Sequence, residues 1–276
     1  MKIWLQKHVV EGRLPELDEC YRAHIEAVVD PGTEVVTHTL PAAAYDSQVP
    51  EQHVTYGALA VHFNHYFART AFQAEREGYD AWVIGAGQDP GLEAARTLAT
   101  IPTLGYGSAT FHLCMRDGIR FGMVGFAAGL REPIVHNIDR YGARNLLAGY
   151  SVIPGGQEAI IDALNGRPGE FLEEFEVAAA GMADAGAQVI VPAEGLPTEI
   201  LWRNNVREAG GIPVLDPLGI VLKTAETEVR LRELGSLARP TTGFFYARPG
   251  EDAVEQVESV FTGDEPGTGG DEVTGP

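Results

Sequence analysis

The sequence predicts an α/β fold of two pseudo-symmetric lobes. Each lobe is expected to be a mostly parallel sheet flanked by helices, with a single cleft between the lobes. Short apolar runs alternate with longer helical patterns along the chain, and one strand–turn–helix layout occurs twice. With 276 residues, 45% hydrophobic residues and 33 glycines, the chain is long and apolar enough for one large domain or two small ones.

The first copy of the layout is GYDAWVIGAGQDPGLEAARTLATIP, residues 78–102. Its apolar run at 81–84 suits a buried strand, and a glycine-rich turn, Gly85–Gln88, follows. Asp89 is a good N-cap and Pro90 a good first helical residue, so the next helix is expected to begin there. Such a turn presents free N–H groups and a positive dipole end, which favour a carboxylate or phosphate; the alternative is an ordinary strand-to-helix turn.

The second copy is GAQVIVPAEGLPTEI, residues 186–200. It predicts a strand at 188–191, a turn at 192–195 and a helix from Leu196 or Pro197. Two such turns could face one another across a single cleft, which favours a ligand site over two unrelated turns.

The remaining elements are predicted in the same way, from apolar runs and helical periodicity. The other strands are expected at 2–5, 33–37, 102–108, 119–125, 149–153 and 212–215. The other helices are expected at 14–29, 56–77, 132–141, 159–164, 169–185, 198–208 and 218–234, with one more around His112 and Cys114. The long polar loop at 41–52 is typical of a lid or a substrate wall.

These elements divide the chain into a first lobe, residues 1–103 plus 212–236, and a second lobe, residues 104–211. The segment 248–276 is rich in Gly, Pro and acidic residues, so an acidic, disordered tail is expected there.

Composition excludes several classes of function. The net charge is −19, and eight acidic residues with no Lys or Arg lie between Gly250 and Pro276, so the rest carries −11. This excess disfavours nucleic acid as a partner. No run approaches the ~20 apolar residues of a membrane span, and MKIWLQKH lacks a signal-peptide core, so no membrane partner and a cytoplasmic location are expected. Cys20 and Cys114 are too few for a disulfide framework.

Polar residues elsewhere provide weaker candidates. Gln6, Lys7 and His8 are expected to leave the C-terminal end of the first strand, the edge where open α/β sheets bind ligands; the alternative is a surface loop. His62 and His65 share a helix face and could bind a metal. A polar helix face explains them equally well and no third ligand stands at a suitable spacing, so no metal is expected.

Together these segments resemble the aspartate/glutamate/hydantoin racemase superfamily, which also includes maleate isomerases and arylmalonate decarboxylases. The resemblance rests on GYDAWVIGAGQDPGLEAAR, on the stretch 102–124, on GAQVIVPAEGL and on GIPVLDPLGIVLKTAE, and it covers roughly residues 1–235. It implies two pseudo-symmetric lobes with the active site between them, chemistry without a cofactor, and assembly into homo-oligomers.

The family's usual chemistry uses two cysteines, one in each strand–turn, that exchange protons with opposite faces of a carbon atom. The resemblance places Ala86 and Ala193 at those positions. Neither side chain can move a proton, and Cys20 and Cys114 lie within predicted helices. The two-cysteine mechanism is therefore expected to be absent.

Glu194 directly follows one of the vacated positions and is the main candidate for a general acid or base. A carboxyl group in a partly dry cleft has its pKa raised toward neutrality; the alternative is that Glu194 caps the following helix. Asp89 and His8 are the other catalytic candidates, although a helix cap explains Asp89. His112 is a secondary candidate, and its alternative is a histidine satisfied within the core. The substrate-binding candidates are Gln6, Ala86, Gly87, Gln88, Tyr106, Ala193 and Gly195.

The sequence thus predicts a cofactor-independent acid/base enzyme for a small carboxylate, amide or cyclic imide. Its reaction could be isomerisation, decarboxylation or other lyase chemistry, or hydrolysis, and a single proton-transfer group favours one-sided chemistry over racemisation. The main alternative is a non-catalytic protein that binds small anions and has lost the thiols. A further alternative is a metal-dependent hydrolase that uses His62 and His65.

Overall fold

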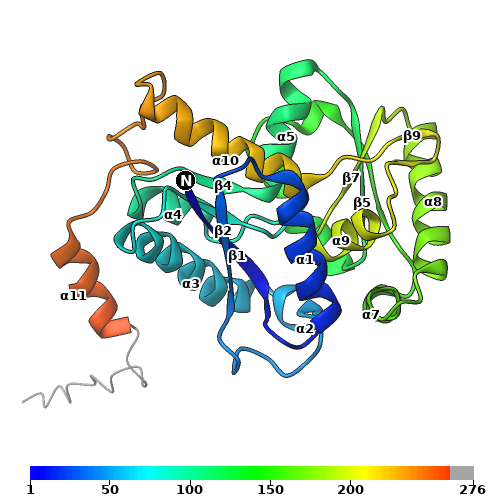
Figure 1. Ribbon diagram of the computed structural model, residues 1–276, viewed down its shortest axis with the longest axis horizontal. Helices are drawn as coiled ribbons and strands as arrows, with labels where there is room; N and C mark the ends of the chain where they lie inside the picture. Colours follow the sequence, from blue (N-terminus) through cyan, green and yellow to red (C-terminus); the bar gives the residue numbers. More distant parts are fainter. Residues whose placement is uncertain (262–276) are drawn as a thin grey trace, which may run out of the picture.

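The computed structural model describes residues 1–261, which build two parallel sheets (Figure 1). The first sheet has the order β2-β1-β3-β4 and contains β1 (Lys2–Val10), β2 (Glu34–Leu40), β3 (Ala81–Ile84) and β4 (Thr103–Gly105). The second has the order β6-β5-β7 and contains β5 (Phe121–Gly125), β6 (Leu147–Val152) and β7 (Val189–Pro192). Val214 forms a parallel bridge to Ile190, on β7. The second sheet therefore repeats the order of the first, in agreement with the predicted pseudo-symmetry of two parallel sheets.

Helices flank both sheets. Those that precede the second sheet are α1 (Pro15–Val28), α2 (Glu51–Val54), α3 (Gly57–Arg76), α4 (Leu92–Leu98) and α5 (Tyr106–Asp117). The later ones are α6 (Arg131–Arg140), α7 (Gly156–Leu164), α8 (Gly169–Asp184), α9 (Gly195–Arg203), α10 (Pro217–Glu233) and α11 (Glu251–Phe261). Two 3-10 turns, Ala128–Leu130 and Arg144–Leu146, and an antiparallel pair, β8 (Glu208–Ala209) and β9 (Ile212–Pro213), complete the described elements.

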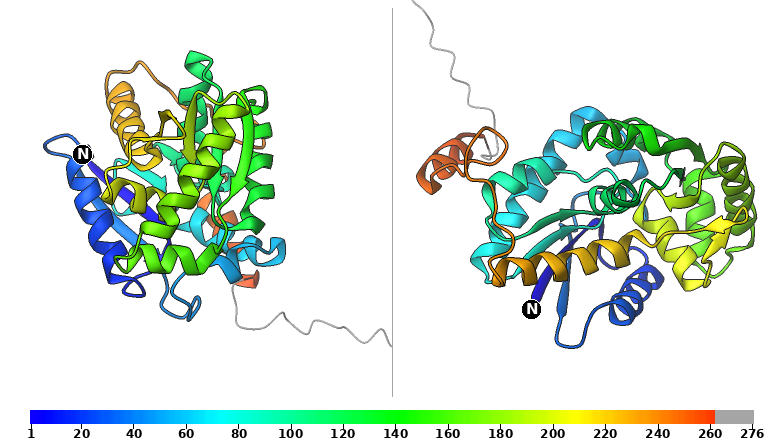
Figure 2. Two further views of the ribbon diagram at one scale, coloured as in Figure 1. Left: turned by 90° about the vertical axis from the view of Figure 1, so that its right-hand side faces the viewer. Right: turned by 90° about the horizontal axis from the view of Figure 1, so that it is seen from above.

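The first sheet is covered on both faces because its strands are apolar on both sides. Ile3 and Leu5 belong to the same buried cluster as residues of α1 and α10. Trp4, which points to the opposite face, packs in a second cluster with residues of α3 and α4. This pattern is expected of a parallel sheet that is buried on both faces. The chain crosses to the second sheet after β4 and returns through α10, which packs on β3 and β4 (Figures 1 and 2).

Two predicted boundaries are wrong in ways that bear on function. Gln6, Lys7 and His8 do not leave the sheet, because β1 continues to Val10 with all three buried. The amide of Gln6 finds partners inside the protein, since it accepts from the Trp4 indole N–H at 3.2 Å and donates to backbone carbonyls. Polar residues can therefore extend this strand instead of ending it.

The helix after β3 also begins later than predicted. Asp89 does not cap it, because Gly91 is the N-cap of α4 and the helix starts at Leu92. Asp89 instead adopts a left-handed conformation with φ of 48°. The strand expected at 102–108 ends at Gly105, since α5 begins with the next residue.

Two further elements have boundaries that differ from the predicted ones. The helix expected at 198–208 is α9, which begins and ends earlier, at residues 195 and 203. Of the strand expected at 212–215, only residues 212–213 pair with β8, and in the antiparallel sense.

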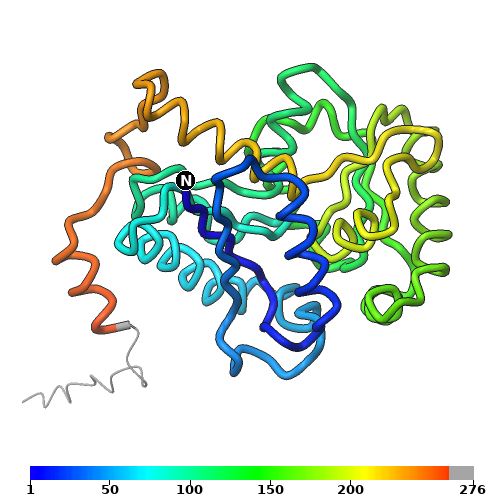
Figure 3. Tube along the Cα trace, in the orientation of Figure 1, coloured from blue at the N-terminus to red at the C-terminus, as the bar shows by residue number. Residues whose placement is uncertain are grey.

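The C-terminal segment is partly helical. Residues 251–261 form α11 within the stretch expected to be disordered, and the rest of that stretch, 262–276, lies outside the described residues. Figure 3 shows the trace of α11 standing apart from both sheets. An ion pair of 2.9 Å between Arg69 and Glu258 links it to α3. Within residues 1–261, no helix combines the length and the apolar character needed to cross a bilayer.

A buried ionic cluster joins helices from both halves of the fold. The His24 imidazole on α1 is fully buried and lies 3.0 Å from a Glu199 carboxylate oxygen on α9 and 2.9 Å from Asp216, the N-cap of α10. Burial by itself would lower the pKa of His24, but hydrogen bonds with Asp216 and Glu199 outweigh it and raise the pKa to about 9.

This cluster predicts a pH-dependent stability. The folded-state pKa of His24 lies above its unfolded value of 6.5, so the contribution is complete below pH 6.5 and is lost as the pH rises through 9. We expect wild type to lose about 3 kcal/mol more than His24→Gln between pH 6.5 and 9.5. Urea unfolding of both proteins across this range measures the difference. Parallel pH profiles would show that His24 is not charged in the folded protein.

Candidate active site between the two lobes

The two strand–turns pack directly against one another. A β-carbon added at Gly87 would lie 1.7 Å from the carbonyl oxygen of Ala193, so only glycine allows this approach. The alanines themselves are 5% exposed (Ala86) and 1% exposed (Ala193). The sequence therefore brings the two turns together, as the duplication predicted.

A small cavity of about 40 Å³ lies beside this contact. At about 10–15 Å³ per water molecule it has room for roughly three waters. Both lobes line it. Its polar and turn residues are His8, Tyr21, Glu51, Gly85, Ala86, Gly87, Gln88, Glu194 and Gly195, and its apolar wall includes Val54, Phe126, Ala127 and Leu196.

Glu194 is the buried acid of this cavity. It occupies the N-cap position of α9, but its carboxylate makes no capping hydrogen bond there and instead accepts from the backbone N–H groups of Phe126 and Ala127, both at 3.3 Å. The side chain is 4% exposed. Burial raises the pKa of Glu194 to about 8, although the two N–H groups oppose the shift. The expectation of a carboxyl group with a near-neutral pKa at this position is consistent with this environment.

The space for Glu194 depends on a glycine. A β-carbon added at Gly125, the last residue of β5, would lie 2.7 Å from a Glu194 carboxylate oxygen and 2.7 Å from the Tyr150 hydroxyl. Among the described residues the Tyr150 hydroxyl has no hydrogen-bond partner. Burial raises the pKa of Tyr150, and the charge of Glu194 raises it further, so Tyr150 is a neutral neighbour of Glu194.

His8 supplies a neutral imidazole. It is 7% exposed, lies against the rings of Phe63 and Phe67, and its pKa is lowered by burial to about 3. The side-chain nitrogen of Gln88 lies 3.3 Å from its Nδ1. Because an amide nitrogen can only donate, Nδ1 accepts and the hydrogen sits on Nε2. That Nε2 has no partner within residues 1–261, so it is a free buried donor.

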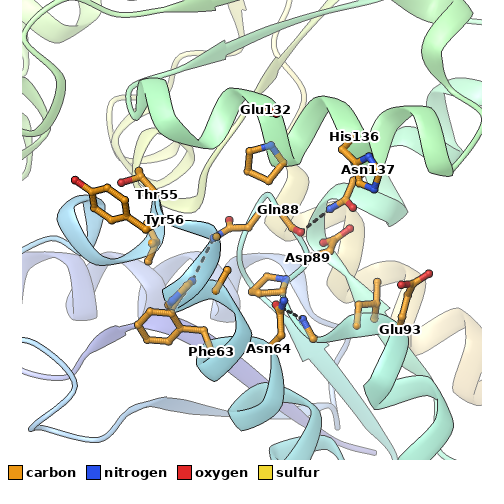
Figure 4. Close-up of a pocket in the computed structure, with 18 of the residues that line it drawn as sticks. Thr55, Tyr56, Phe63, Asn64, Gln88, Asp89, Glu93, Glu132, His136 and Asn137 are labelled. Atoms are coloured by element: carbon orange, nitrogen blue, oxygen red, sulfur yellow. Dashed lines mark hydrogen bonds between the residues drawn. The ribbon is translucent and has the colours of Figure 1, made fainter.

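A second, larger cavity of about 610 Å³ adjoins the first and shares His8, Val54 and Gln88 with it. Figure 4 shows its polar side chains gathered from α3, from the turn after β3 and from α6. Those labelled there include Thr55, Tyr56, Asn64, Glu93, Glu132, His136 and Asn137. The side-chain amide of Asn137 donates to the Gln88 carbonyl, so α6 of the second lobe holds the first lobe's turn.

Asp89 lines the larger cavity, but its carboxylate is fully engaged inside the protein. It accepts from the backbone N–H groups of Gly107 at 2.8 Å and Ser108 at 2.7 Å, and from the Tyr141 hydroxyl at 3.0 Å. Burial raises its pKa to about 6, and these hydrogen bonds oppose the shift. Asp89 therefore caps α5, the helix after β4, and not the helix that follows it in sequence. A β-carbon at Gly105 would collide with this carboxylate.

Removal of this cap is expected to be costly. Asp89→Ala leaves two buried N–H groups at the start of α5 without acceptors, so we expect a loss of roughly 2–4 kcal/mol in the free energy of unfolding. Asp89→Asn keeps one acceptor oxygen and should lose less. Urea unfolding measures both variants. An alanine variant as stable as wild type would contradict the capping role.

Several candidates from the sequence do not reach either cavity. Gln6 is bonded within the first sheet, as described above. Tyr106 is buried behind the second turn, where its hydroxyl donates to the Glu194 carbonyl at 3.2 Å and contacts Thr198. His112 is exposed on α5. Ala193 contacts Gly87 but is not among the residues of the cavity walls, whereas Ala86, Gly87, Gln88 and Gly195 line the smaller cavity.

The thiols and the paired histidines lie elsewhere. Cys20 and Cys114 are buried within α1 and α5, and burial raises the pKa of both thiols, that of Cys114 to about 11. His62 and His65 are exposed on α3. The described part of the chain contains no cluster of three or more His, Cys, Asp or Glu residues that could hold a metal ion.

Sequence reasoning missed Glu51, Tyr150 and the N–H groups of Phe126 and Ala127. Glu51 lies within the loop that was expected to wall the substrate, and the two N–H groups lie directly after β5, at an edge where ligands bind in such sheets. Tyr150 had no comparable signal, because its position next to Glu194 depends on the pairing of β5 with β6.

Comparison with known proteins identifies the family. Residues 14–225 match the family model described as Asp/Glu/Hydantoin racemase. The chain belongs to this family. The resemblance inferred from the sequence motifs is thereby confirmed.

Individual relatives agree with this assignment. The hydantoin racemase of Pseudomonas sp. (strain NS671) is 28% identical over 166 residues, which span 58% of this chain and 62% of that protein. The hydantoin racemase of Paenarthrobacter aurescens is 26% identical over 167 residues, which span 58% of this chain and 66% of that protein. The chain therefore spans less than two thirds of the length of these curated relatives. The structure of allantoin racemase from Klebsiella pneumoniae shares the fold, with a TM-score of 0.71 and 24% identity over 91% of this chain and 94% of that one.

Proposed function

We propose that this protein is a cofactor-independent enzyme that moves a proton at a carbon atom next to a carbonyl group. Glu194 is its proton-transfer group, and its substrate is a small carboxylate, amide or cyclic imide, with a substituted hydantoin as the first choice. The observation that carries the proposal is the Glu194 carboxyl group, which is buried, lines the small cavity between the lobes and has a pKa of about 8. Such a group both gives and takes a proton near pH 7.

His8 supports the same chemistry. When a proton leaves the carbon, negative charge develops on the neighbouring carbonyl oxygen, and a fixed donor in a dry site stabilises that charge. The unpartnered Nε2–H of His8 is such a donor. The cavity beside Glu194 has room only for the reacting end of a substrate, so its substituent is expected to occupy the adjoining 610 Å³ cavity.

The names of the curated relatives favour this substrate class. Both are hydantoin racemases, and the carbon of a hydantoin that carries the substituent is bonded to a carbonyl group and a nitrogen, which makes its hydrogen acidic. The proposal takes Ala86 and Ala193 to stand at the family's thiol positions, so the carboxyl group replaces a thiol. The expected cytoplasmic location and homo-oligomeric assembly remain part of the proposal.

Proton NMR in D₂O tests the function. Purified protein is incubated with 5-substituted hydantoins, amino acids, substituted malonates, maleate and cyclic amides. Loss of an α-proton signal without new products supports an isomerase, whereas new signals would identify decarboxylase, other lyase or hydrolase chemistry by the same acid/base group.

One observation favours a second candidate, a protein that binds small anions without turnover. Alanines, Ala86 and Ala193, stand at the two positions where the resemblance places the family's thiols, which is the pattern that a loss of catalysis would leave. A ligand of such a protein raises its melting temperature and gives no exchange and no product. That combined result would overturn the enzyme proposal.

A further inference from the structure

A second carboxyl group reaches the cavity of Glu194 from the opposite lobe. Glu51 is the first residue of the four-residue helix α2, which follows the long loop of the first lobe, and it lines the same small cavity. A β-carbon added at Gly156 would lie 3.8 Å from one Glu51 carboxylate oxygen and 4.0 Å from the other. The Glu51 carboxylate therefore extends from the first lobe to the N-terminal end of α7, a helix of the second lobe.

The two carboxyl groups influence each other. Burial raises the pKa of Glu51, and a hydrogen bond from the Gln157 backbone opposes this shift. The charge of Glu51 in turn contributes to the raised pKa of Glu194. Two carboxylates that share a site resist double ionisation, because like charges repel at short range. At neutral pH Glu194 therefore holds a proton, while Glu51 is the more readily ionised of the two.

His8 does not provide the second group. Its pKa of about 3 keeps the imidazole neutral at pH 7, and as a base it would become a buried cation without a partner carboxylate. Its Nε2 already carries a hydrogen and can donate to an oxygen of the substrate. Glu51 is thus the group beside Glu194 that can accept a proton at neutral pH.

We propose that Glu51 is the second proton-transfer group of this cavity, serving one face of the substrate carbon while Glu194 serves the other. This inference rests on the proposed function and deepens it from proton exchange to inversion. In one direction the Glu51 carboxylate takes the hydrogen as a proton, and the C–H electron pair moves into an enolate whose oxygen faces His8. The Glu194 carboxyl group then gives its proton to the opposite face. Glu51 ends protonated and Glu194 ionised, and proton exchange with water restores both.

The segment that carries Glu51 also forms part of the wall of both cavities. Pro50 and Val54, on either side of Glu51, line the small cavity, and Thr55 and Tyr56 line the larger one. A substrate that enters from the larger cavity therefore passes the same segment that delivers the carboxylate.

Separate measurements of inversion and exchange test the assignment. The wild type, Glu51→Gln and Glu194→Gln are incubated in D₂O with each enantiomer of 5-methylhydantoin. Proton NMR follows the loss of the α-proton, and circular dichroism follows inversion. We expect Glu51→Gln to invert at least 100-fold more slowly, while one enantiomer still exchanges its α-proton within 10-fold of wild type. Glu194→Gln should exchange the α-proton of the other enantiomer only, because Glu51 is then the remaining proton-transfer group.

Glu158→Gln provides the matched control, because Glu158 is an exposed acid of α7 that lines neither cavity. It should invert at the wild-type rate. If Glu51→Gln slows inversion and exchange of both enantiomers by the same factor, or slows neither, Glu51 is not a proton-transfer group. If the wild type neither exchanges the α-proton of 5-methylhydantoin nor inverts its configuration, the proposal that Glu51 takes part in inversion is wrong. Exchange or product formation elsewhere in the substrate panel would still support the proposed function.

Discussion

Replacement of Glu194 by Gln is expected to abolish turnover and to stabilise the protein at alkaline pH. The amide has nearly the shape of the carboxyl group but cannot take up or release a proton, so inversion, which needs proton transfer at the face that Glu194 serves, should slow about 10³-fold. The side chain still fills the space beside Gly125. Loss of activity would therefore not reflect a collapsed site.

The stability change has a defined pH dependence. The folded-state pKa of Glu194, about 8, lies above its unfolded value of 4.5, so the folded protein binds this proton more tightly. The contribution of Glu194 to the stability of the wild type is greatest below pH 4.5 and is lost as the pH rises from 4.5 to 8, because over this range the carboxyl group ionises in the unfolded chain but stays protonated in the folded one. Glu194→Gln has no carboxyl group to ionise at this position, so it does not lose this contribution to stability as the pH rises. At pH 9 we expect the variant to be more stable by roughly 2–4 kcal/mol, a value reduced from the full shift because its amide satisfies only one of the two N–H donors.

Urea unfolding at pH 5, 7 and 9, combined with the NMR assay, measures both effects on one preparation. A stability difference that grows with pH while activity is absent would support a buried acid that is kept for chemistry at a cost in stability. Full activity in the variant would remove Glu194 from the mechanism, and a pH-independent stability difference would mean that its carboxyl group ionises normally.

The sequence predicts the fold and half of the site for identifiable reasons. The alternation of short apolar runs with helical patterns predicts parallel sheets, and the repeated turn predicts that Gly87 and Glu194 lie near one another. Both inferences depend on local pattern and on the symmetry of the two halves. The outcome for Asp89 shows the limit of such patterns. Its Asp-Pro context favours a local cap, but β4 lies beside β3 in the sheet and brings the N–H groups of α5 to its carboxylate.

Glu51 illustrates the same limit more clearly. The sequence around Glu51 is polar and without periodicity and so predicts a loop, whereas Glu51 begins α2. Its place in the cavity depends on a contact with the start of α7, more than a hundred residues later in the chain. Burial and partners, which decide whether a carboxyl group can act as an acid, are properties of the folded chain. Charge and residue type alone do not distinguish Glu51 from the exposed Glu132.

His8 should contribute through a hydrogen bond and not through its charge. We expect His8→Asn to lower kcat about 10²–10³-fold, the usual effect of removing a donor to a developing oxyanion. His8→Gln provides the matched control, because its longer side chain can place an amide N–H near the position of Nε2. It should recover much of the activity, whereas the shorter Asn can only replace Nδ1.

The pH profile separates a donor from a base. With a pKa lowered to about 3, His8 does not titrate between pH 5 and 8, so the wild-type rate should change on the alkaline side near pH 8, where Glu194 ionises, and on the acidic side only through Glu51. His8→Asn should keep that profile at a lower rate. A rate change near pH 6.5 that disappears in His8→Asn would show that the imidazole carries the proton itself. His8 would then act as a base whose Nε2 becomes accessible to solvent during turnover. The hydrogen-bond donor role inferred from its burial would be wrong.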